Sequence, residues 1–183
     1  YLTLETNYKI EAGGFETGLR AHDISYHCNF KTMPTEIDYR LPPTAEHPRI
    51  EGPQTAFVTG PSGDEIYTDK HGRVKVVFHW DRYGKPDENS SCWVRVSQGL
   101  AGNKWGMIAL PRVGQEVIVE FEEGDPDRPI ITGRVYNGQN AAPYSLPKNK
   151  TISTSKTNSS KGGGGFNEIR FEDKKGSEQL FVH

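Results

Sequence analysis

The residues that could carry chemistry in this chain are its histidines, its acidic side chains and its two cysteines. His22 and His27 lie five residues apart, and on a strand an odd spacing points two side chains to opposite faces. A metal ion shared by these two histidines is therefore disfavoured. His71 and His79 flank a valine-rich segment without a neighbouring serine or cysteine that would complete a nucleophile and base pair. We interpret both as surface or sheet-face residues.

An acidic run at Glu122, Glu123, Asp125 and Asp127 is the best place to look for a cation site or paired carboxylates. Its spacing does not follow the order of ligands in an EF-hand loop. Residues 124–129 read GDPDRP, in which proline fixes one dihedral angle and aspartate accepts bonds from nearby backbone amides. The run is therefore interpreted as a solvated turn.

Cys28 and Cys92 stand in different segments and outside a CxxC spacing, which favours free thiols over a metal or redox site. The four glycines at 162–165 are not a phosphate loop, because no strand leads into them and no Gly-Lys-Ser/Thr follows. We expect no catalytic residues, no cofactor and no metal in this chain. The expectation is that it is not an enzyme.

A third set of side chains combines aromatic rings with basic groups, as single-strand nucleic-acid platforms do: Trp80, Tyr83, Trp93, Trp105, Arg73, Lys75, Arg82 and Arg95. The overall charge is balanced, with 22 basic against 24 acidic residues, whereas nucleic-acid domains show a basic excess. Trp80 also alternates with Val74, Val76 and Phe78, which is the spacing of a barrel core. The core interpretation is favoured, and a module that binds nucleic acid or oligosaccharide is the alternative.

The elements that would position these residues are short β-strands. Glycine and proline number 20 and 12, and both disfavour helix interiors. Residues 2–10 alternate without a break, and 22–33 form a second β-like run. Residues 41–63 contain five prolines, which is typical of a connection between domains, and a boundary is placed near Pro48.

Between residues 73 and 136, short alternating segments at 73–81, 92–97, 116–122 and 130–136 are separated by glycine-rich corners. Four or five such strands suit a small closed barrel of the OB type. The alternation selects the candidates for the barrel core, which are Val74, Val76, Phe78, Trp80, Val117, Val119 and Phe121.

After Asn140 the sequence becomes polar, and residues 148–161 hold seven serines or threonines with a single aliphatic residue, Ile152. This composition predicts a linker or a very polar strand. Beyond the glycines, Ile169 and Phe171 alternate with charged residues, as do Leu180 and Val182 after a turn. Two short strands do not hold together alone in water, so they need neighbours from elsewhere.

Five stretches carry a family resemblance: RIEGPQTAFVTGP (49–61), DKHGRVKVVFHWDR (69–82), SSCWVRVSQGLAGNKWG (90–106), LPRVGQEVIVEFEEGDPDRPIITGRVYN (110–137) and GFNEIRFEDKKGSEQLFVH (165–183). Through them the chain resembles VgrG, the valine-glycine repeat spike family of bacterial type VI secretion systems. That family is related to the hub and cell-puncturing needle of contractile phage tails. HDISYHCNF and MPTEIDYR also resemble the end of the family's hub region.

The resemblance implies an all-β chain cut from a longer protein. Residues 1–48 would be the C-terminal part of the hub domain and 49–140 the OB-fold domain. A polar linker over 141–165 would lead into the start of a trimeric β-helix or β-prism needle at 166–183. The candidates for the trimer interface are Ile169, Phe171, Leu180 and Val182. The phage relative inserts a lysozyme domain after its OB-fold, for which residues 140–165 leave no room.

The function implied is a mechanical one, a spike that caps the secreted tube and punctures a membrane without staying bound to it. The partners implied are two further copies of the chain in a homotrimer, the ring protein of the secretion tube, baseplate components, and a PAAR-type tip protein or effector cargo. Nucleic acid is not expected. The resemblance also implies assembly in the bacterial cytoplasm followed by secretion through the type VI system, and no signal peptide is visible in the first residues, YLTLETNYK.

Overall fold

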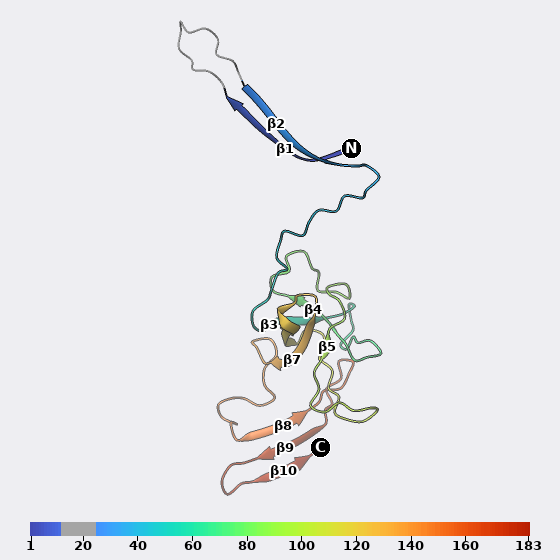
Figure 1. The fold of residues 1–183 in the computed structure, drawn as a ribbon. Helices are drawn as coiled ribbons and strands as arrows, with labels where there is room; N and C mark the ends of the chain where they lie inside the picture. The colour runs from blue at the N-terminus through green and yellow to red at the C-terminus, as the bar shows by residue number, and fades with distance from the viewer. Residues whose placement is uncertain (12–24) are drawn as a thin grey trace. The chain divides into compact units, whose positions relative to one another are not determined.

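The computed structural model describes residues 1–11 and 25–183, and Figure 1 shows short strands joined by long connections. The one helical element among the described residues is the short 3-10 turn η1 (Glu122–Gly124). The chain divides into two compact units, Tyr1–Glu46 and His47–His183. The division falls close to Pro48, where the proline-rich stretch predicted a boundary. His22 and the start of the run predicted at 22–33 lie outside the described residues.

The first unit is an antiparallel hairpin of β1 (Leu2–Glu11) and β2 (Ser25–Met33). Its register places Tyr8 opposite Cys28 and Ile10 opposite Tyr26 on one face, which is largely exposed within this unit. The opposite face is charged. A two-stranded hairpin gains stability only when such an apolar face packs against something else.

The second unit contains a curled five-stranded sheet in the order β4-β3-β6-β7-β5. Its strands are β3 (Gln54–Thr59), β4 (Lys75–Phe78), β5 (Arg95–Val96), β6 (Glu116–Phe121) and β7 (Pro129–Val135). The pairs are antiparallel except for β5 with β7. A register shift between Ile118 and Val119 bends β6 against β7, as bulges do. An isolated bridge between Val74 and Val94 joins the segments before β4 and β5, so the sheet curls toward closure.

The core of this partial barrel consists of small and branched aliphatic side chains. The buried set is Ala56, Val58, Val74, Val76, Val94, Val117, Val119 and Ile131. Of the residues selected by alternation, Val74, Val76, Val117 and Val119 are in this set, and Phe78 and Phe121 pack against it. Strands with a period of two bury one face in this way.

The expectation for Trp80 is wrong, because its side chain is 59% exposed. Strand β4 ends at Phe78, and the amide of Asp81 donates to the carbonyl of Phe78 across a turn. The alternation therefore stops before it reaches Trp80. The indole instead stacks on Phe78 at 5.0 Å between ring centroids and donates to Gln54 Oε1 at 2.7 Å.

The C-terminal part of the second unit is a three-stranded antiparallel sheet in the order β10-β9-β8. Its strands are β8 (Ile152–Lys156), β9 (Glu168–Glu172) and β10 (Gln179–Val182). Strand β8 lies inside residues 148–161, for which the sequence predicted a linker or a very polar strand, and residues 152–156 form the strand. Its serine and threonine side chains do not prevent pairing, since the backbone bonds to β9 are independent of side-chain polarity. No helix of the described residues is long and apolar enough to cross a membrane.

The barrel and this sheet are joined by polar contacts within the second unit. Glu65 Oε1 accepts a bond from the amide of Gly162 at 2.5 Å, and Arg112 Nη2 donates to the carbonyl of Asn158 at 2.7 Å. Lys161 also approaches Asp64 at 3.3 Å. These contacts attach the glycine-rich segment between β8 and β9 to the surface of the barrel.

Candidate association surface

The four residues expected at a trimer interface lie together on one face of the hairpin formed by β9 and β10. The register pairs Ile169 with Val182 and Phe171 with Leu180, and directly opposite residues in an antiparallel pair point to the same side. Their side chains are 50%, 69%, 49% and 62% exposed in that order. We call this set the apolar face. It is a continuous row of large hydrophobic groups that the single chain leaves in water.

The other face of the same sheet buries a carboxylate. Glu168 is 3% exposed and accepts bonds from the Tyr144 hydroxyl at 2.6 Å and from Thr154 Oγ1 at 2.8 Å. Lys156 lies 3.7 Å away, and Arg170 Nη1 donates to the Tyr144 oxygen at 3.1 Å. The Tyr144 bond first, and then Thr154 and the two cations, hold the pKa of Glu168 below its usual value against the opposing effect of burial.

The sheet therefore buries one carboxylate on its charged side, while its apolar side is open. Tyr144, from the segment before β8, does the covering on the charged side. Fully burying a Val, Leu, Ile or Phe side chain stabilises a protein by about 1.5–3 kcal/mol. With roughly half of each surface still in water, each of the four would gain roughly 1 kcal/mol on association. This face can therefore bind another apolar surface.

The acidic run selected from the sequence separates into two roles. Glu122 forms ion pairs with Arg95 and, at 2.5 Å, with Arg128. The Arg95 hydrogen bond is the main cause that lowers the pKa of Glu122. Asp125 Oδ1 accepts the amide of Asp127 at 2.9 Å. That bond closes the turn predicted from GDPDRP.

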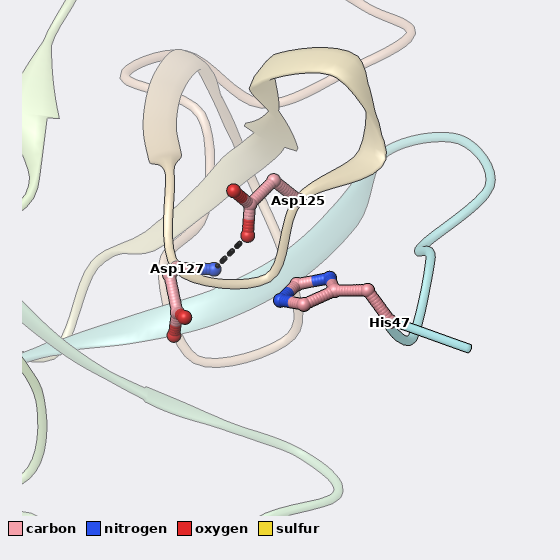
Figure 2. A group of neighbouring side chains, drawn as sticks. All are labelled: His47, Asp125 and Asp127. Carbon is pink, nitrogen blue, oxygen red and sulfur yellow. Dashed lines mark hydrogen bonds between the residues drawn. The ribbon is translucent and has the colours of Figure 1, made fainter. Parts of the chain in front are cut away.

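One neighbour of this turn was not predicted. Figure 2 shows the His47 ring beside Asp125 and Asp127, and the possible ligand atoms of the three lie within 4.8 Å of one another. His47 Nδ1 donates to the carbonyl of Pro48 at 3.1 Å. The amide of Ile50 donates to the carbonyl of Gly124, which brings the two segments together. His47 and Asp127 are exposed, and the turn accounts for the aspartates without an ion.

The aromatic and basic residues weighed as a nucleic-acid platform do not form one row of stacked rings. Arg73, Trp93 and Arg95 line one hollow together with the acidic Glu122 and Asp127, and the rings of Trp80 and Trp105 are not part of its lining. Their contacts are local pairs: Trp80 on Phe78, Trp93 on Tyr67 with Lys75 above the ring, Trp105 against Gly102, Arg73 with Asp69, and Arg95 with Glu122. A strand-binding groove needs consecutive stacking surfaces along one track. The structure distributes these rings instead.

The remaining reactive side chains that the sequence offered have local partners. His71 follows Asp69 in a turn where Asp69 Oδ1 accepts the His71 amide at 2.9 Å. His79 Nε2 shares a hydrogen bond with Thr55 Oγ1 at 3.0 Å. Cys28 and Cys92 are free thiols in different units. Among the described residues of the second unit, the hydrogen bonds given for His71 and His79 join neither of them to Cys92.

Comparison with known proteins first defines the class. Residues 58–136 match the family described as the type VI secretion system/phage-baseplate injector OB domain, which confirms the predicted OB fold. Residues 153–183 match the bacteriophage T4 gp5 C-terminal trimerisation domain. The second match begins within β8 and includes the whole apolar face. The class is thus an injector-type OB domain followed by a trimerisation region.

Individual relatives then identify the family. The chain is 53% identical over 185 residues to type VI secretion system spike protein VgrG1a of Pseudomonas aeruginosa, covering 100% of this chain and 29% of the relative. It is 54% identical to VgrG1b of the same organism, covering 100% of this chain and 25% of the relative. Actin cross-linking toxin VgrG1 of Vibrio cholerae is 52% identical over 87% of this chain and 14% of the relative. The chain belongs to the VgrG family and spans less than a third of the length of these relatives.

Proposed function

We propose that this chain is the barrel and needle-base portion of a type VI secretion spike, working as a homotrimer and without catalysis of its own. The observation that carries the proposal is the apolar face of Ile169, Phe171, Leu180 and Val182, which the single chain leaves exposed. This face lies within the match to a trimerisation domain. Three copies would bury it against one another around a common axis.

The proposed work is mechanical, and the division of the molecule supports it. The barrel has its own apolar core, so each copy would remain folded while three are held together at the sheet. Interchain packing would also cover strand edges that otherwise expose unpaired backbone groups. Residues 1–48 would belong to the hub, 49–140 to the OB domain and 166–183 to the needle. Strand β8, at residues 152–156, would also belong to the needle rather than to a linker.

The remaining partners follow from the role of a spike. They are the ring protein of the secreted tube, baseplate components, and a PAAR-type tip protein or effector cargo at the far end of the needle. The target membrane would be pierced rather than stably bound. The chain would be assembled in the bacterial cytoplasm and then expelled into the medium or into a target cell.

The proposal is tested by measuring the mass of the chain in solution with light scattering and sedimentation equilibrium. The expected mass is three times the chain mass of 20.5 kDa. Leu180→Asp places a charge in the buried centre of the proposed trimer and should reduce the mass to that of one chain. Leu41→Asp makes the same substitution at a leucine that is 75% exposed in the connecting segment, and it should leave the trimer intact.

Two results would contradict the proposal. One is a Leu180→Asp variant that remains trimeric, because the apolar face would then play no part in association. The other is a monomeric wild-type chain that binds single-stranded DNA in a salt-dependent way, as electrostatic binding to phosphates requires. That second result would support the OB module as a nucleic-acid binder.

A further inference from the structure

The turn that follows η1 brings together a histidine and two aspartates whose ligand atoms the turn itself uses only in part. Asp125 Oδ1 accepts the Asp127 amide at 2.9 Å, and this bond closes the turn. The second oxygen of Asp125, the carboxylate of Asp127 and the ring of His47 are not needed for that bond. We call His47, Asp125 and Asp127 the joint site, because it joins two segments that are far apart in the sequence.

The three side chains of the joint site are close enough to share one ion. Their possible ligand atoms lie within 4.8 Å of one another. Around a zinc ion, with bonds of about 2.0–2.2 Å, two ligand atoms lie at most about 4.4 Å apart. His47 and Asp127 are exposed, so small rotations of their side chains close this difference without disturbing a packed core.

The His47 ring is oriented for binding a cation. Its Nδ1 lies 3.1 Å from the carbonyl oxygen of Pro48, which can only accept, so Nδ1 carries a proton and Nε2 of the neutral ring carries a lone pair. Figure 2 shows the ring nitrogen farther from the backbone directed toward the two aspartates. Metal-binding histidines commonly donate from their other nitrogen to a carbonyl in this way. Among the ion pairs of the described residues, none joins His47 to either aspartate.

The neighbouring basic side chains are engaged with other acceptors. Arg95 and Arg128 both pair with Glu122, and the Arg49 guanidinium donates to a backbone carbonyl of η1 at 3.2 Å. In the part of the chain that the structure describes, no ion pair links a basic side chain to either aspartate of the joint site. Two carboxylates close to each other disfavour their charged forms. A bound cation would supply the countercharge.

Backbone contacts hold the two segments of the joint site together. The Ile50 amide donates to the Gly124 carbonyl at 2.8 Å. At Gly124, φ is 76° and a Cβ would lie 3.1 Å from the Ile50 carbonyl oxygen, so this close approach favours glycine. His47 is the first residue of the second unit, and these contacts set it beside the turn. The sequence expectation of no metal did not include this third ligand, which only the fold supplies.

We propose that the joint site binds one divalent transition-metal ion of the zinc type through Nε2 of His47 and carboxylate oxygens of Asp125 and Asp127. One imidazole nitrogen with two carboxylate oxygens suits such ions, whereas calcium and magnesium favour oxygen ligands throughout. Water would complete the coordination, since two of the three residues are exposed. The bound ion would fasten the beginning of the second unit to the barrel. The inference does not depend on the proposed trimer.

The experiment is calorimetric titration of the full chain, without an affinity tag, with zinc chloride. The expected result is one zinc ion per chain. His47→Gln and Asp127→Asn should each weaken zinc binding at least about tenfold, since even the outer partners of metal ligands contribute that much. His71→Gln is the matched control, because His71 is also exposed and its bond to Asp69 is made by the backbone amide. It should leave the zinc affinity unchanged.

A second measurement locates the ion. Manganese, added as a paramagnetic probe at less than one equivalent, should broaden the amide NMR signals of residues 47–50 and 124–127 most strongly, and His47→Gln should reduce this broadening. Zinc binding that is equally tight in the wild-type, His47→Gln and Asp127→Asn chains would place the ion elsewhere and overturn the proposal. Broadening that is unchanged in His47→Gln would show that the carboxylates act without the histidine, which also overturns it. A wild-type chain that binds no zinc overturns the joint site and leaves the proposed trimer standing.

Discussion

The barrel buries its apolar side chains within the single chain, whereas the three-stranded sheet leaves a row of them exposed. In the barrel, eight aliphatic residues are buried, and Thr59 is the buried polar side chain, bonded to Ser90 at 2.5 Å. In the sheet, the buried residue is Glu168, while Ile169 and Phe171 beside it remain half exposed. Both regions are built from alternating strands, and all their pairs are antiparallel except β5 with β7 in the barrel. The difference lies in where the partner of each apolar face comes from.

This contrast teaches that alternation identifies an apolar face without saying what covers it. In β6, Val117 and Val119 meet the other strands of the same curled sheet. In β9, Ile169 and Phe171 alternate just as regularly, but three strands do not curl around them. A region that buries a carboxylate and exposes a row of large hydrophobic groups has the pattern of an interaction surface. The sheet is therefore where the chain depends on association.

The largest expected effect comes from making one substitution in both regions. Ile131 is 1% exposed in the barrel and Ile169 is 50% exposed in the sheet. Ile131→Ala should lower the free energy of unfolding by about 2–5 kcal/mol, because it removes buried methylenes and leaves a cavity. Ile169→Ala should lower it by less than about 1 kcal/mol in the dissociated chain. Urea denaturation followed by tryptophan fluorescence, at concentrations below association, measures both.

Association provides the control for this pair. At high concentration, Ile169→Ala should raise the dissociation constant of the trimer although it hardly changes the unfolding free energy of the dissociated chain. Ile131→Ala should lower that unfolding free energy and leave the dissociation constant of the trimer nearly unchanged. Equal losses of unfolding free energy at low concentration would break the comparison. They would mean that the single chain already buries Ile169.

A smaller effect is expected at the rim of the barrel. Trp80→Ala removes a ring that stacks on Phe78 but remains 59% exposed. Aromatic pairs contribute about 0.5–1.5 kcal/mol beyond the area they bury, so a loss of about 1 kcal/mol is expected in the same denaturation experiment. Trp80→Phe keeps an aromatic ring over Phe78 and should recover most of it. A loss of about 3–5 kcal/mol in unfolding free energy would instead indicate that Trp80 is buried in the core, as its spacing predicted.

Much of the barrel could be predicted from the sequence, because its strands are short, regular and bounded by glycine and proline. Alternation selected Val74, Val76, Val117 and Val119, all of which are buried. It failed at Trp80 because the end of β4 depends on a turn rather than on hydrophobic pattern. Local periodicity carries no information about such an ending.

The candidate site was only partly predictable. Ile169, Phe171, Leu180 and Val182 were selected from period two, and the register places them on one face. Strand β8 was harder to assign, because serine and threonine give no apolar face and its pairing with β9 comes from the tertiary fold. His47 and Tyr144 were missed for a similar reason. Each meets its partners across a long sequence separation that no local motif indicates.

The smallest expected effect is a dependence on pH that separates the two regions. The pKa of Glu168 lies below its usual value of about 4.5, chiefly because of the Tyr144 hydrogen bond. A carboxyl group with a lowered folded-state pKa stabilises the fold above its usual pKa, and this contribution is lost as pH falls through the folded value. Below about pH 4.5, amide signals of β9 in NMR spectra should therefore broaden before those of β4 in the barrel, since the sequence of β4, KVVF, contains no carboxylate. In the Glu168→Gln variant, the signals of the two strands should broaden at the same pH. Simultaneous broadening in the wild-type chain would contradict the prediction, because it would show that acid destabilises the whole unit.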